Sequence, residues 1–249
     1  MSEVVAAVNE VQNPVWGASR PSLLALRVAA GESPEWIAAR TDSLLRSLQS
    51  AFDVSSWQLA ADNIWEPWEG SPDDLVNIVR KHPVREFIGA SEAIGDPLPD
   101  EGYSFTISGI GPRVSPLVRI AAGHPAVGQR MPRRRLAVEL REAHEKALRR
   151  VDADAVTAAV VETWQPATTE FADLDVRRLA RRGNWKIGVG YRTWISKEVG
   201  AVTHLVDRLT ATELSGGTMI SAPDDWPAAR VVEAVTATLR ENGLDEVPH

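Results

Sequence analysis

The sequence predicts an α+β fold in which a largely antiparallel sheet packs against several amphipathic helices. Several segments alternate apolar with polar residues, which is the pattern of half-buried strands. Other segments repeat apolar residues every three or four positions, which is the pattern of helices with one buried face. The predicted strands follow one another between helices instead of alternating strictly with them, so antiparallel pairing is favoured.

The composition is that of a globular protein from a reducing compartment. The chain has 249 residues, 44% of them hydrophobic, a formal net charge of −7 and no cysteine. The lack of cysteine excludes disulfides, thiolate nucleophiles and cysteine-ligated metal centres. No run approaches the roughly 18 apolar residues of a membrane helix, and the N-terminus has no basic start, so neither a membrane span nor a signal peptide is predicted. We expect a cytoplasmic protein with one domain over residues 1–249, in which residues 1–12 form a loose extension.

The first predicted elements are a strand over residues 23–30 and a helix over residues 34–50. Ser33 supplies the N-cap of this helix and Pro34 its first turn, and apolar residues recur along one of its faces. A short strand over residues 56–60 is predicted to follow the helix.

The next stretch, DNIWEPWEG, breaks all periodicity with a proline and a glycine, so an exposed loop is predicted there. Ser71 and Pro72 then repeat the cap-and-proline signal and start a second helix that runs to about His82. Residues 89–102 are predicted to form an acidic, turn-rich connection.

The middle of the chain predicts a pair of strands and then a helical region. Large apolar residues alternate with serine and threonine over residues 103–108, and a second strand is predicted over residues 117–122. The short connection between these strands predicts antiparallel pairing. The stretch over residues 133–164 is ambiguous at its start and helical afterwards: the apolar residues in 136–151 fit a helix, and a further helical run is predicted over 156–164.

The C-terminal part predicts three more strands and two helices. The strands are expected over residues 168–172, 185–195 and 217–222, where the middle one is long and alternating. A short basic helix is predicted over residues 174–181. The last helix is predicted over residues 227–242, because proline opens it, a valine stripe follows and glycine ends it.

Charge is distributed unevenly along the chain. Residues 53–101 contain eleven acidic side chains and three basic ones, a local net charge of −8. Such a segment repels nucleic acid and attracts a basic partner, although it is also typical of a solvated loop. The one dense cationic cluster consists of Arg130, Arg133, Arg134 and Arg135, which could bind phosphate groups or form a solvated turn.

The residues that could support catalysis form no specific motif. The five histidines lack the spacing of a zinc site, and no glycine-rich nucleotide loop or nucleophile elbow is present. His124 follows a predicted strand, where it could act as a base or simply occupy a turn. Asp173 and Asp175 could hold a divalent cation, but capping of the basic helix is the favoured interpretation. We therefore expect no catalytic residues, no metal and no cofactor.

Two tryptophans differ from the others in their setting. Trp65 and Trp68 lie in the predicted loop among acidic residues, whereas most of the nine tryptophans fall in or beside regular elements. Aromatic side chains surrounded by charge are typical of protein-binding hot spots. The alternative is that both rings fold back onto the sheet.

Several separated motifs resemble one family. They are VWGASRPS with Trp16, Gly17 and Arg20, then Trp57, Trp164-Gln165-Pro166, Gly190-Tyr191-Arg192-Thr193-Trp194-Ile195, and Gly217-Thr218-Met219-Ile220. In order and spacing these motifs resemble the immunity protein 52 family of bacterial polymorphic toxin systems, over about Asn13 to Arg240. The late strand of that family has its tryptophan and tyrosine in the opposite order, which leaves the subfamily open.

The resemblance implies a cytosolic α+β protein that is not an enzyme and that neutralises a cognate toxin domain by binding it. The toxin of such a system is usually a nuclease of the restriction-endonuclease type. An acidic surface could occupy the groove that would otherwise hold DNA phosphates. From charge and loop character we predict a partner-binding surface made of Trp65, Glu66, Trp68, Glu69, Asp73, Asp74, Asp96, Asp100 and Glu101.

Two other functions stay open at this point. A nucleic-acid-binding protein would use the cluster from Arg130 to Arg135, and its affinity would fall steeply with salt. A metal-dependent enzyme would use Asp173, Asp175 or His124. The leading prediction includes no nucleic-acid partner and no membrane.

Overall fold

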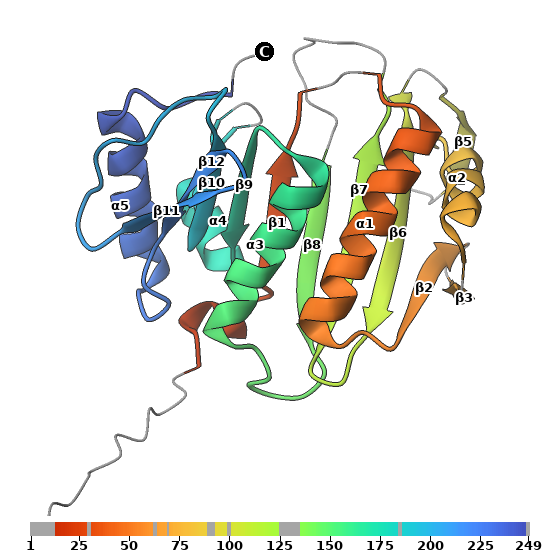
Figure 1. Ribbon diagram of the computed structural model, residues 1–249, viewed down its shortest axis with the longest axis horizontal. Helices are drawn as coiled ribbons and strands as arrows, with labels where there is room; N and C mark the ends of the chain where they lie inside the picture. The colour runs from red at the N-terminus through yellow and green to blue at the C-terminus, as the bar shows by residue number, and fades with distance from the viewer. Residues whose placement is uncertain are drawn as a thin grey trace, which may run out of the picture.

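The fold is that of a computed structural model, which describes residues 13–28, 31–61, 64–68, 70–88, 93–98, 101–124, 135–183 and 186–247. Its main feature is a sheet of ten strands in the order β11-β12-β10-β9-β1-β8-β7-β6-β2-β3, in which all neighbouring strands are antiparallel (Figure 1). The strands are β1 (Ser22–Leu26), β2 (Ser56–Ala61), β3 (Ile64–Trp68), β6 (Tyr103–Ile110), β7 (Val114–Ala122), β8 (Arg135–Glu142), β9 (Thr168–Ala172), β10 (Arg192–Ser196), β11 (Thr210–Leu214) and β12 (Gly217–Ser221). Strands β4 (Arg85–Ile88) and β5 (Ala93–Pro97) form a separate hairpin. The prediction of an α+β fold with a largely antiparallel sheet is confirmed.

Two long helices cover one face of the sheet. Helix α1 (Pro34–Phe52) contacts β7, and α3 (Arg150–Trp164) contacts β1, β9 and β10 (Figure 1). The core between these layers is closed by fully buried aliphatic side chains. They include Leu23, Ile107, Val118 and Val138 from the sheet and Leu44, Leu48, Val156 and Val160 from the helices.

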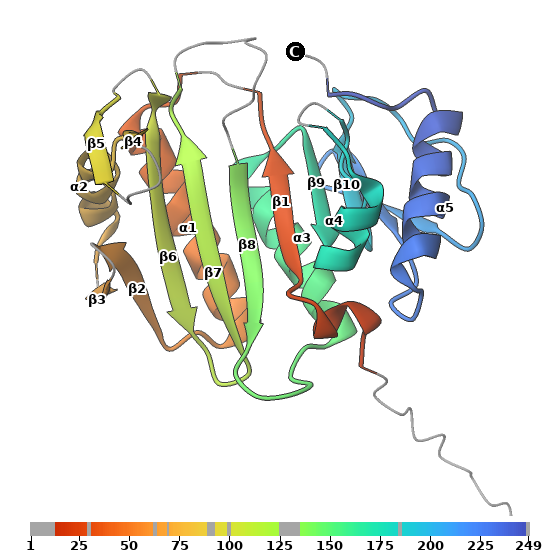
Figure 2. The ribbon, with the colours of Figure 1, turned by 180° about the vertical axis from the view of Figure 1, so that it is seen from behind.

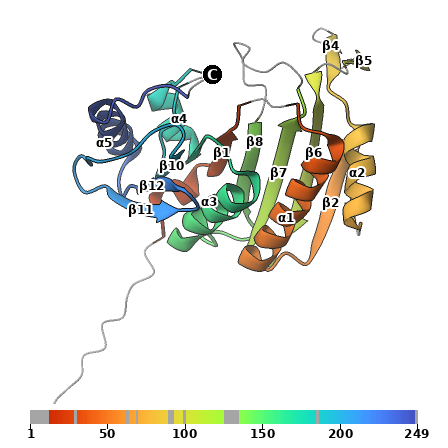
Figure 3. The ribbon, with the colours of Figure 1, turned by 45° about the horizontal axis from the view of Figure 1, so that its top comes forward.

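The other helices lie at the two ends of the sheet. Helix α2 (Pro72–Lys81) packs beside α1 and contacts β6. Helices α4 (Leu174–Ala180) and α5 (Ala228–Glu241) contact each other at the end that holds β9 to β12 (Figure 3). On the face opposite α1 and α3, strands β6, β7, β8 and β1 have no helix of the described residues over them (Figure 2).

Caps explain where the N-terminal helices begin. The Ser33 side chain accepts a hydrogen bond from the Trp36 amide at 3.2 Å, and Pro34 occupies the first turn of α1. Ser71 and Asp74 form a capping box at α2, in which each side chain bonds to the other residue's amide. Helix α1 ends at Asp53, whose positive φ of 53° breaks the helical path. Both predicted helix starts are confirmed.

Two predicted elements were wrong in type. Residues 135–142 form strand β8 instead of the start of a helix, because Leu136, Val138 and Leu140 face the core with a period of two. Leu136 and Leu140 are spaced by four residues, and this spacing fits a helix and a strand equally well. The stretch after residue 61 was predicted as a loop, but residues 64–68 form the edge strand β3.

Other boundaries also differ from the prediction. Strand β5 lies within the predicted connection 89–102, and β11 was not predicted at all. The long strand predicted over 185–195 is confined to β10, residues 192–196. The helices predicted at 174–181 and 227–242 and the strands at 168–172 and 217–222 are confirmed within a residue or two. Among the described residues, no helix is both long enough and apolar enough to cross a membrane.

Candidate functional site

Strand β3 carries the first residues of the predicted partner-binding surface. Trp65 pairs with Ala60 and Glu66 pairs with Leu59 across the antiparallel ladder. Leu59 is buried on the side of the helices, so Glu66 points to that side and Trp65 to the uncovered face. Trp65 is 42% exposed and its neighbour Ile64 is 60% exposed. The sheet therefore ends in an edge strand that presents two large apolar side chains and a carboxylate to solvent.

Trp68 does not share the exposure of Trp65. It lies opposite Trp57 on the helix side and packs against the core, and its buried indole nitrogen has no hydrogen-bond partner among the described residues. A Cβ on Gly70 would lie 2.0 Å from that nitrogen, so the backbone closes tightly over the ring. Of the two tryptophans, one is exposed and the other folds back onto the sheet.

The acidic residues of α2 lie at its N-terminal end, next to β3. Asp73 and Asp74 are both exposed, and Asp74 accepts bonds from the Ser71 amide at 2.9 Å and the Ser71 hydroxyl at 3.0 Å. Within the described part of the chain, Glu66 and Asp73 have no ion-pair partner. We name Trp65, Glu66, Asp73 and Asp74 the acidic edge.

The remaining predicted residues lie elsewhere. Asp96 is exposed on β5. Glu101 lies 3.7 Å from the imidazole of His124, beside the start of β6. This region adjoins the C-terminal end of α2, because the Ser104 amide donates to the His82 carbonyl at 2.9 Å. The predicted surface therefore divides between the two ends of α2, while Glu69 and Asp100 lie outside the described residues.

Of the two candidate metal ligands at helix α4, one caps it and the other lies on its exposed side. Asp173 caps α4 by accepting a hydrogen bond from the Val176 amide at 2.8 Å, as the capping interpretation predicts. Asp175 lies 3.9 Å from Arg178 on the exposed side of the helix. In the part of the chain that the structure describes, no three histidine, aspartate or glutamate side chains are grouped as metal ligands.

The burial of Asp173 predicts that the stability of the protein depends on pH. Burial raises the pKa of the Asp173 carboxyl, although the hydrogen bond from the Val176 amide acts in the opposite direction. The ionised carboxylate therefore lowers the stability of the folded protein as the pH rises above 3.8, the ordinary pKa of an aspartate. Asparagine keeps the cap without the charge, so Asp173→Asn should be at least as stable as the original protein at pH 7. Asp173→Ala should be less stable than the asparagine variant by about 1 kcal/mol. Urea unfolding at pH 7 measures both, and an asparagine variant as weak as the alanine variant would contradict the capping role.

The arginine cluster is mostly outside the described residues. Arg130, Arg133 and Arg134 lie there entirely. Arg135 opens β8, but its side chain is not among those described.

A buried ion network connects two of the resemblance motifs, those that contain Trp16 and Arg192. The Arg192 side chain is 5% exposed and bonds Asp224 through both terminal nitrogens, each at 3.0 Å. Its Nε bonds Asp154, and the Trp16 indole donates to Asp224 at 2.8 Å. Burial alone would lower the pKa of Arg192, but its bonds to the two aspartates outweigh burial and hold the pKa above the ordinary value. The network thus links the N-terminal segment, α3, β10 and the loop after β12 through hydrogen bonds, and we interpret its role as stabilisation of the fold.

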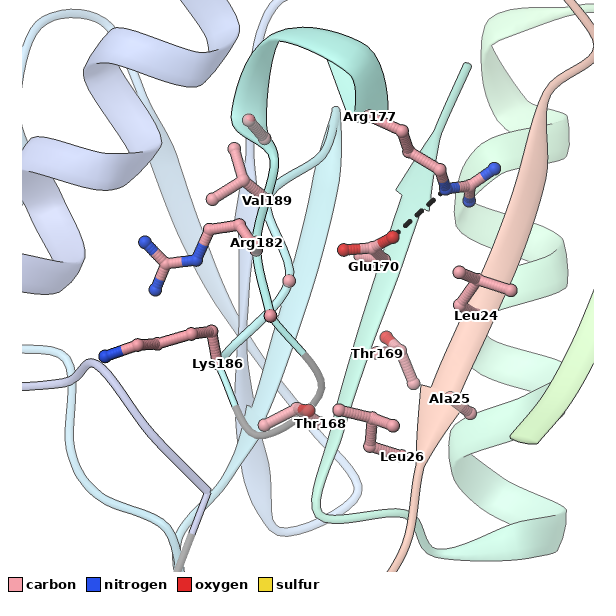
Figure 4. A pocket seen from close by; sticks show the side chains of 13 residues that line it. Leu24, Ala25, Leu26, Thr168, Thr169, Glu170, Arg177, Arg182, Lys186 and Val189 are labelled. Atoms are coloured by element: carbon pink, nitrogen blue, oxygen red, sulfur yellow. Dashed lines mark hydrogen bonds and ion pairs between the residues drawn. The ribbon is translucent and has the colours of Figure 1, made fainter. Parts of the chain in front are cut away.

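A pocket of about 310 Å³ opens beside the uncovered face (Figure 4). Leu24 and Leu26 from β1, Glu170 from β9 and Val189 contribute to its lining. Arg177 donates to Glu170 at 3.1 Å and to the Ser22 hydroxyl and carbonyl at 2.6 Å.

The side chains of two further cationic residues, Arg182 and Lys186, also line the pocket. Figure 4 shows the side chains of Arg182 and Lys186 pointing away from Glu170. Arg182 bonds Asp245 at 2.9 Å, and Lys186 bonds the same carboxylate. The lining is therefore mixed, because Leu24, Leu26 and Val189 share it with Thr168, Thr169 and the ion pair between Arg177 and Glu170. No pattern in the sequence predicted this pocket, and the basic residues of α4 were its only signal.

Comparisons with known proteins identify no family for this chain. No family model matches the sequence, and no curated protein matches it. Among solved structures the fold is similar to that of the Pseudomonas aeruginosa T6SS protein PA0821, with 8% identity and a TM-score of 0.47. That likeness covers 90% of this chain and 73% of the other.

Proposed function

We propose that this protein is an immunity protein that binds and neutralises a nuclease-type toxin of a bacterial polymorphic toxin system. The proposal begins from the sequence motifs that resemble the immunity protein 52 family. In the structure it is supported above all by the acidic edge, where Trp65 and Glu66 are exposed on opposite faces of β3 and the carboxylates of Glu66 and Asp73 have no cation bound to them within the described residues. The protein acts by binding in the cytoplasm, not by catalysis.

The chemistry of the acidic edge suits a basic partner. A nuclease must hold DNA phosphates in a groove lined with cations, and carboxylates can occupy such a groove in their place. Exposed Trp65 on one side of β3 and exposed Ile64 on the side of Glu66 offer apolar area that a contact around this edge would desolvate. Charge would guide the two proteins together, and the aromatic contact would slow their separation.

The experiment is a binding measurement between the purified protein and the toxin domain encoded beside its gene. We expect a complex that survives gel filtration and that abolishes cleavage of DNA or RNA by the toxin. A toxin that remains fully active at a saturating excess of this protein would refute the proposal. Direct binding of nucleic acid by this protein, with an affinity that falls steeply with salt, would favour the alternative function.

A further inference from the structure

The uncovered face of the sheet has a composition that solvent exposure alone does not explain. Exposed faces of antiparallel sheets normally carry polar side chains. Here Leu24 of β1, Ala137 of β8 and Arg119 of β7 lie side by side in one cross-strand row. Leu26 and Ala121 belong to the next row on the same face, one on each side of Arg135, and the structure leaves Leu24, Leu26, Ala121 and Ala137 half-buried. We name these four residues the apolar centre.

The apolar centre continues into the pocket. Leu24 and Leu26 form one wall of the 310 Å³ pocket and also belong to the centre (Figure 4). This volume is at the lower end of the range for small-molecule sites, which begins at about 300 Å³. It is large enough for one side chain, whose apolar part would contact Leu24 and Leu26.

Arginine outnumbers carboxylate around the apolar centre. Arg119 and Arg141 both bond Glu139, at 3.2 and 3.0 Å, and their side chains are 50% and 46% exposed. Burial opposes ionisation of Glu139, but the bonds from the two arginines outweigh it and hold the pKa of its carboxyl below the ordinary value. Arg20 lines a hollow with Glu139 and Arg141, and among the described residues it has no ion-pair partner. The border therefore keeps an excess of positive charge on a protein whose net charge is −7.

We propose that this face is a second contact surface for the toxin. An apolar segment of the toxin, bordered by carboxylates, packs on this face, and one of its side chains enters the pocket. This inference rests on the proposed function and adds a surface distinct from the acidic edge. An apolar centre with a polar, arginine-containing border is the usual anatomy of a protein interface. A second copy of this chain is a poorer occupant, because a two-fold contact would bring the arginine borders together. Nucleic acid is also poorer, because the aliphatic centre offers no ring for base stacking.

The test substitutes the middle of the apolar centre. Ala137→Glu places a carboxylate where the toxin should be apolar and acidic, while Arg119 opposite can stabilise the new side chain within the free protein. Ala211→Glu is the matched control, because Ala211 is exposed on β11 at the far edge of the same sheet. Circular dichroism and thermal unfolding would verify that both variants fold. If Ala137→Glu fails to fold, Arg141→Glu at the exposed border replaces it.

Calorimetric titration with the toxin domain then measures the affinity of each variant. We expect Ala137→Glu to weaken binding about a hundredfold, the usual loss at the centre of an interface, and Ala211→Glu to leave it unchanged. Unchanged affinity in Ala137→Glu, with binding by the original protein intact, would overturn this inference and leave the proposed function standing. Failure of the original protein to bind would overturn both. Binding of a short DNA duplex that Ala137→Glu abolishes would instead assign the face to nucleic acid and overturn the inference.

Discussion

Replacement of Arg192 by leucine is expected to lower the free energy of unfolding by about 3–5 kcal/mol. The substitution leaves Asp224 without the guanidinium that meets both of its oxygens in a nearly solvent-free site. Removing one partner of a buried pair costs far more than the pair itself contributes, because the remaining charge stays desolvated. Urea unfolding followed by circular dichroism measures the loss.

A matched control separates burial from charge. Arg46 pairs with Asp42 at 2.9 Å on the exposed side of α1, so Arg46→Leu should cost under 1 kcal/mol. Equal losses in the two variants would show that the Arg192 network does not hold the four segments together.

Reversing charge at the acidic edge is expected to slow association with the toxin by about 10-fold to 100-fold at low salt. The double variant Glu66→Lys and Asp73→Lys exchanges two exposed carboxylates of the acidic edge for cations. The effect should shrink as salt is raised, because exposed charges are screened over about 10 Å at 0.1 M. Stopped-flow mixing at two salt concentrations measures the association rate.

The control for this variant changes the net charge by the same amount elsewhere. Glu198 and Glu213 are exposed residues at the opposite end of the sheet, in or near β11. The variant Glu198→Lys and Glu213→Lys should associate within about twofold of the original rate, apart from the general effect of net charge. An equal slowing in both variants would mean that the acidic edge is not the site of contact.

Local signals in the sequence predicted the helices well. Serine followed by proline marks the start of α1 and of α2, and both caps depend only on neighbouring residues. Strand β8 was missed because its leucines satisfy two periodicities, and only its neighbours β1 and β7 decide between them. Strand β3 was missed because Pro67 and the charges of the stretch resemble a loop, although proline is tolerated at an edge.

The candidate surfaces depend on contacts between distant segments. Charge and aromatic content led to Trp65 and Asp73, but the direction of each side chain follows from the register of β2 and β3. The pocket joins residues near positions 24, 170 and 189, which the sequence separates widely. Arg192 and Asp224 likewise meet only in the folded chain, so no local pattern could indicate their pairing.

Neutralisation of a toxin by binding is tested by co-expression of this protein with the toxin domain encoded beside its gene. Cell survival and co-purification are the two readouts. We predict survival and a stable complex, and loss of both when Ala137→Glu is combined with Glu66→Lys and Asp73→Lys. Cell death at normal levels of this protein, with no complex recovered, would contradict neutralisation by binding and mean that its motifs specify a fold without this function.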